Sequence, residues 1–66
     1  MAPHEQRVVD EKEALEDKVR KLEVFIQTNE TYTSLENMDK LLLAMQLSTM
    51  QTYAAILATR ISRFGE

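Results

Sequence analysis

The residues of this chain best suited to binding chemistry are three arginines, a lysine and a tyrosine. They are Arg7, Lys12, Tyr53, Arg60 and Arg63. Guanidinium groups bind phosphate through paired hydrogen bonds, and an aromatic ring stacks on a nucleobase. These residues come from both ends of the chain, so they form one site only where the chain folds back on itself. They are the candidate ligand-binding residues.

Catalytic and metal chemistry find no comparable support. The only histidine is His4, beside Pro3, and the chain has no cysteine. A nucleophile–base pair, a thiolate metal site and a Glu-x-x-His metal site therefore cannot be assembled. Gly65 is the only glycine, which excludes a glycine-rich phosphate loop. We expect no enzyme activity, no metal and no cofactor.

Length and charge narrow the class of protein further. Sixty-six residues form a single domain of marginal stability, and without cysteine no disulfide can support it. Association with further copies is the remaining source of stability. The formal net charge of −3 makes nucleic acid an unfavourable partner. The N-terminal residues lack the positive start and apolar core of a secretory signal, so we expect a cytoplasmic protein.

One amphipathic helix is predicted over about residues 5–27. Its apolar positions follow a heptad spacing with one polar member: Val8, Lys12, Leu15, Val19, Leu22 and Ile26. Oppositely charged pairs four residues apart favour the helix on its outer face: Lys12–Glu16, Glu16–Arg20 and Asp17–Lys21.

A turn is predicted over about residues 28–33, followed by a second helix over about 34–64. Thr33 and Glu36 have the spacing of a helix-capping box, and Gly65 is a natural stop. One short turn between two helices favours antiparallel packing. The predicted fold is all-α: a single domain, residues 1–66, that forms an antiparallel two-helix hairpin and assembles into a homo-oligomeric helical bundle.

The second helix is apolar on more than one side. No charged residue occurs between Leu41 and Thr59. One heptad stripe consists of Leu43, Leu47, Met50, Ala54, Leu57, Ile61 and Phe64. A second, mixed stripe consists of Leu35, Met38, Leu42, Met45, Thr49 and Ile56. A third is made of small residues: Ala44, Ser48, Gln51, Ala55, Ala58 and Ser62.

A membrane span would need about twenty mainly apolar residues. Gln46 and Gln51 would be costly in hydrocarbon, so we expect no membrane partner. One partner helix covers only one of the three stripes. We therefore expect further copies of the chain to cover the others.

Antiparallel packing gathers the candidate residues at one end. A turn centred near Thr31 places Arg7 level with Leu57, and brings Arg60 and Arg63 near the start of the first helix. Structural explanations stand beside the functional one. The two C-terminal arginines favour the helix dipole. Tyr53 suits a core position with its hydroxyl at the rim, and Lys12 suits a position that sets helix register.

Two stretches carry a resemblance to known proteins: QRVVDEKEALEDKVRKLEVF (6–25) and QLSTMQTYAAILATRISRF (46–64). Together they resemble a group of short phage and prophage helical proteins with no established activity. The resemblance implies a bacterial host cytoplasm. In architecture the chain is also similar to the phage helical-hairpin sponges of the anti-CBASS and anti-Thoeris type. Those proteins hold cyclic-nucleotide or cyclic ADP-ribose signals between subunits.

The candidate residues, the helix surfaces and these resemblances suggest three functions. The first is non-catalytic sequestration of a nucleotide immune signal by an oligomeric anti-defence protein, with a cyclic nucleotide or ADP-ribose-type ligand. The second is a protein-binding inhibitor or adaptor that acts on a host protein through a helix surface. The third is an RNA-binding four-helix-bundle dimer, because the ending ISRFGE (61–66) is faintly like that of a plasmid-encoded RNA-binding hairpin.

Overall fold

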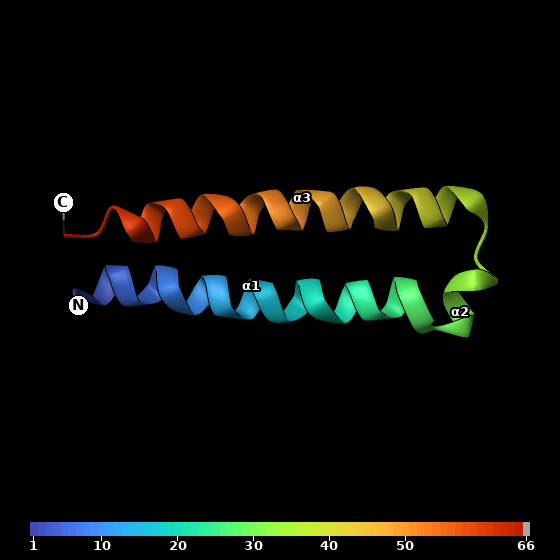
Figure 1. The fold of residues 1–66 in the computed structure, drawn as a ribbon, viewed down its shortest axis with the longest axis horizontal. Helices are drawn as coiled ribbons and strands as arrows, with labels where there is room; N and C mark the ends of the chain where they lie inside the picture. Colours follow the sequence, from blue (N-terminus) through green and yellow to red (C-terminus); the bar gives the residue numbers. More distant parts are fainter. Residues whose placement is uncertain (66) are drawn as a thin grey trace.

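The computed structural model describes residues 1–65 as three helices: α1 (Pro3–Thr28), α2 (Glu30–Thr33) and α3 (Asn37–Ser62). The long helices α1 and α3 lie side by side and run in opposite directions, so the start of α1 and the end of α3 lie at the same end (Figure 1). We call this the open end. The short α2 lies at the other end, and the described residues contain no strand. The prediction of an all-helical chain is confirmed.

The first helix begins earlier than expected because its N-terminus is capped. Pro3 occupies the first helical position, where its missing N–H costs nothing. The carboxylate of Glu5 accepts a hydrogen bond from the backbone N–H of Ala2 at 2.9 Å. The proline and this hydrogen bond favour a helix that begins at Pro3 rather than near residue 5.

Ion pairs join side chains three or four residues apart along α1, with one difference from the expected pairing. The ammonium of Lys12 lies 2.5 Å from the carboxylate of Glu16, and that of Lys21 lies 2.9 Å from Asp17. Arg20 pairs with Asp17, at 3.5 Å, rather than with Glu16. The hydrogen bond from Lys21 holds the pKa of Asp17 below its usual value. These exposed pairs stabilise the helix modestly.

The connection between the long helices is longer than predicted. The Asn29 side chain accepts a hydrogen bond from the backbone N–H of Thr31 at 2.8 Å and starts α2 inside the predicted turn. Thr33 does not begin the next helix. Its hydroxyl donates to the carbonyl of Glu30 at 2.7 Å, and α3 begins at Asn37 with Glu36 as its N-cap.

Tyr32 links the connection to both long helices. Its ring meets that of Phe25, on α1, edge to face with centroids 6.1 Å apart. The ammonium of Lys40, on α3, lies 5.6 Å from the centroid of the Tyr32 ring. One residue of α2 therefore contacts a side chain near the end of α1 and another near the start of α3.

The core lies along the seam between α1 and α3. Val19 and Leu57 are the buried apolar residues, and Leu57 has no exposed surface. The first stripe of α3 and the heptad of α1 are half-buried or buried along their whole length. A narrow core of this kind is expected when two helices meet along one stripe each.

The face of α3 that points away from α1 is exposed and apolar. We call its residues the outer stripe: Met38, Leu42, Met45, Thr49, Thr52 and Ile56. The exposed fraction is 53% for Leu42 and Ile56 and reaches 63% for Met38. Leu41, beside the stripe, is equally exposed. By length and composition alone, α3 is also apolar enough to cross a membrane.

One side-chain hydrogen bond joins the long helices. The hydroxyl of Tyr53, on α3, donates to a carboxylate oxygen of Glu11, on α1. Both residues are exposed, so this contact lies at the edge of the seam rather than inside it. It fixes which flank of α1 meets which flank of α3.

We predict that Leu57→Ala destabilises the fold strongly. Removing a fully buried leucine costs about 2–5 kcal/mol. The free energy of unfolding, measured by chemical denaturation at a fixed protein concentration, should fall by an amount in that range. Val24→Ala, at a residue that is 57% exposed, is the control and should change it far less. Equal losses in the two variants would contradict the assignment of the core.

The Tyr53–Glu11 contact gives a second prediction. Tyr53→Phe and Glu11→Gln should each lower the free energy of unfolding. Their double variant should lose less than the sum, because the same bond is removed twice. We expect a coupling of about 0.5–1 kcal/mol for an exposed hydrogen bond to a carboxylate. Additive losses in thermal or chemical unfolding would show that the bond does not stabilise the helix pair.

Candidate binding site at the open end

A shallow groove of about 360 Å³ lies on the exposed side of α3 near the open end. We call it the outer groove. Its lining comes entirely from α3 and its C-cap: Thr52, Ala55, Ile56, Thr59, Arg60 and Arg63. The two arginines stand one turn apart and are both exposed. The groove therefore combines two guanidinium groups with hydroxyl and apolar side chains.

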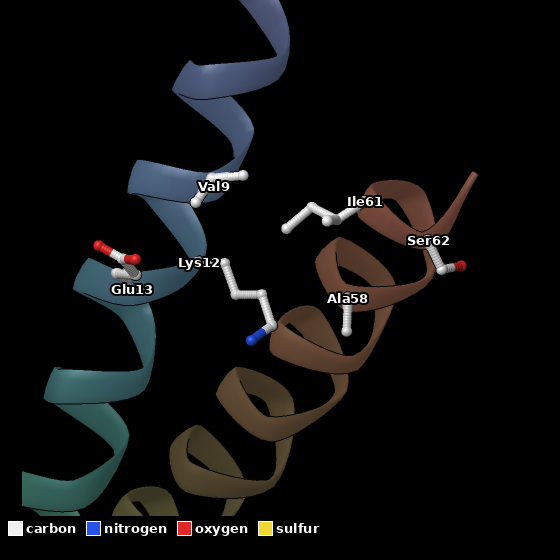
Figure 2. Close-up of a pocket in the computed structure, with 6 residues that line it drawn as sticks. All are labelled: Val9, Lys12, Glu13, Ala58, Ile61 and Ser62. Atoms are coloured by element: carbon white, nitrogen blue, oxygen red, sulfur yellow. The ribbon is translucent and has the colours of Figure 1, made fainter. Parts of the chain in front are cut away.

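A second groove, of about 370 Å³, lies between the two long helices (Figure 2). Val9, Lys12 and Glu13 line it from α1, and Ala58, Ile61 and Ser62 line it from α3. Figure 2 shows Lys12 extending from α1 into the space between the helices. Its ammonium is bound to Glu16, so much of its charge is already compensated.

Two observations describe how the long helices are aligned. Glu11 and Tyr53 share a hydrogen bond, and the residue midway between them, Tyr32, is also midway between Arg7 and Leu57, the pair that the sequence places level. Lys12 shares a groove with Ala58 and Ile61, which lie further toward the open end.

The contact between Glu11 and Tyr53 relates the remaining candidates to one another. Arg7 precedes Glu11 by one helical turn, and Arg60 follows Tyr53 by two turns. Because the helices run in opposite directions, helical periodicity places Arg7 and Arg60 on the flank that carries this contact, toward the open end. We call Arg7, Tyr53, Arg60 and Arg63 the open-end cluster.

The five candidates are therefore distributed over three places. Arg60 and Arg63 line the outer groove, and Lys12 lines the groove between the helices. Arg7 and Tyr53 line neither groove, and both are exposed on the flank that Arg60 shares.

Several lining residues were missed by reasoning from the sequence. Thr52, Ile56 and Thr59 lead to the candidate Arg63 with a 4-3-4 spacing, which places all four on one face of a helix. That spacing is the signal in the sequence that could have identified the outer groove. Glu11 was missed because only the tertiary register brings it to Tyr53.

The electrostatics of the open end suit an anion. Both guanidinium groups of the outer groove are permanently charged. Arg60 also lies in the last turn of α3, where a cation favours the helix dipole, so a structural role accompanies a binding role. Within residues 1–65, no three histidine, aspartate or glutamate side chains gather closely enough to hold a metal ion.

Comparison with known proteins shows the family of this chain. Neither a curated protein nor a solved structure matches the chain. A protein-family model described as Sequestin matches residues 2–63, which contain all of α1, α2 and α3. The grooves and the open-end cluster lie within or directly beside the matched residues, and the chain belongs to the Sequestin family.

Proposed function

We propose that this protein is a phage-type anti-defence protein that sequesters a nucleotide immune signal without chemically changing it. In this proposal it acts in the cytoplasm of the bacterial host, as a homo-oligomer built from α1–α3 hairpins. The observation that carries the proposal is the open-end cluster. Arg60 and Arg63 line one groove together, and Arg7 projects from the flank of Arg60.

The guanidinium groups suit the phosphates of a cyclic nucleotide or an ADP-ribose-type ligand. A guanidinium presents a fixed fork of N–H donors that matches two oxygens of one phosphate. Two such groups one turn apart fit a ligand with two phosphates, or one phosphate approached from both sides. An acidic protein with a local cluster of arginines favours binding at that cluster over general attraction to polyanions.

The rest of the outer groove suits the sugar and the base. The hydroxyls of Thr52 and Thr59 donate to backbone carbonyls, each at 3.1 Å. Their oxygens remain acceptors for ribose hydroxyl groups. Ala55 and Ile56 offer apolar surface to a base, and the exposed ring of Tyr53 lies on the neighbouring flank.

The family name supports the same class of function. Sequestin describes a protein that sequesters, and sequestration requires binding groups but no bond-making machinery. The outer groove provides guanidinium donors, hydroxyl acceptors and apolar contacts. A ligand held in this way would be recovered unchanged after the protein is unfolded.

The exposed outer stripe favours a second candidate, a protein-binding inhibitor or adaptor. Large apolar patches on small proteins often mark contact surfaces. Here the partner would be a host protein, and the working residues would be Met38, Leu42 and Met45 rather than the arginines. This candidate predicts that a host protein co-purifies with the chain and that nucleotides have no effect on its melting temperature.

The nucleotide proposal is tested by thermal unfolding with a panel of cyclic dinucleotides, cyclic trinucleotides and ADP-ribose derivatives. A ligand at one hundred times its Kd adds about 2.7 kcal/mol to the stability of the folded protein. For a domain of this size, that energy raises the melting temperature by roughly 10 °C or more. Mass spectrometry of the heated sample should find the ligand intact.

Substitution of the arginines in the outer groove tests whether the ligand binds there. Arg60→Ala and Arg63→Ala should each reduce the ligand-induced shift by most of its size. Arg20→Ala, which removes an exposed guanidinium from the outer face of α1, should leave the shift unchanged. No shift with any member of the panel would reject the proposal, and so would recovery of a hydrolysed ligand.

A further inference from the structure

The outer stripe of α3 is complementary to the same stripe of a second copy that runs in the opposite direction. Leu42 lies seven residues before Thr49, and Ile56 lies seven residues after it. Seven residues are two turns, so the three side chains share one face, and all three are exposed. Two α3 helices laid antiparallel with Thr49 beside Thr49 would set Leu42 of each copy against Ile56 of the other.

The charges of α3 fit the same arrangement. Asp39 and Lys40 lie in the first turn, Arg60 lies in the last turn, and no charge lies between them. Asp39, Tyr53 and Arg60 are spaced by multiples of seven, which places them on one flank. Antiparallel packing about Thr49 brings Asp39 of one copy level with Arg60 of the other at both ends. Parallel packing would instead leave Asp39 and Arg60 at opposite ends of the helix pair.

We infer that the outer stripe of α3 is the docking surface for a second copy of this chain, packed antiparallel about Thr49. The second copy completes the arginine site: its Asp39 orients Arg60, and its Met38 covers the outer groove from the exposed side. The part that concerns the ligand rests on the proposed function. The packing itself does not depend on it.

A second copy covers this face better than lipid does. The flank that carries Asp39 and Arg60 also carries Gln46, whose side-chain amide donates a hydrogen bond to the sulfur of Met50, at 3.9 Å. An amide and an ion pair of this kind would be costly in hydrocarbon. Against another helix, the outer stripe buries its apolar side chains while the charged groups meet at the rim.

The docking geometry also explains how Arg60 serves two partners. Its guanidinium has five N–H donors, and a carboxylate uses two of them at most. Asp39 of the second copy would fix the orientation of the group and leave donors for a phosphate. The antiparallel pair then has two equivalent sites, one at each end, and each combines residues from both copies.

Cysteine cross-linking tests the packing directly, because the chain has no cysteine of its own. A disulfide needs Cα atoms within about 7 Å. Thr49→Cys should form a disulfide-linked dimer on mild oxidation, because Thr49 meets its own counterpart. Gln51→Cys, at an equally exposed position on another side of α3, should stay unlinked. Leu42→Cys and Ile56→Cys should each stay unlinked alone and should link to one another when mixed.

A charge exchange tests the contact at the rim. Asp39→Arg and Arg60→Asp should each raise the dissociation constant of the dimer, measured by analytical ultracentrifugation. The double variant should return that constant to its original value.

Self-linking of Leu42→Cys would show parallel packing and overturn the proposal. Linking of Thr49→Cys no stronger than that of Gln51→Cys would overturn it too, as would partition of the protein into phospholipid vesicles. None of these readouts uses a nucleotide, so failure of the proposed function and failure of the packing are distinguishable.

Discussion

The constraint on which the rest of the structure depends is the apolar surface that surrounds α3. One helix can bury one stripe of its neighbour, and α1 buries the stripe that contains Leu57. The opposite face keeps Met38, Leu42, Met45 and Ile56 more than half exposed. Within residues 1–65 no other element covers them, so both the stability and the function of the protein depend on what packs against that face.

The connection at the closed end decides how the two long helices are aligned. Asn29 starts an extra turn, and Tyr32 contacts Phe25 on one helix and Lys40 on the other. These contacts hold the helices in one alignment, with Glu11 bonded to Tyr53 and Lys12 in one groove with Ala58. Aromatic and cation contacts far from the open end therefore control which charged residues meet there.

The open end shows how structural and binding roles combine in one residue. Arg60 favours the dipole of α3, lines the outer groove and shares a flank with Tyr53. The Tyr53–Glu11 hydrogen bond sets that flank against α1. In this arrangement an anion would replace no existing core contact, because the outer groove lies on the exposed side of α3.

The sequence by itself determined the two long helices, because hydrophobic periodicity is local. The heptad from Val8 to Ile26 and the stripe from Leu43 to Phe64 predicted two long helices and the faces on which they meet. Only the tertiary structure decided the start of α3 at Asn37, the register, and the contact between Glu11 and Tyr53. Those features depend on how residues of the connection pack against both helices, and a spacing rule within one helix carries no information about that packing.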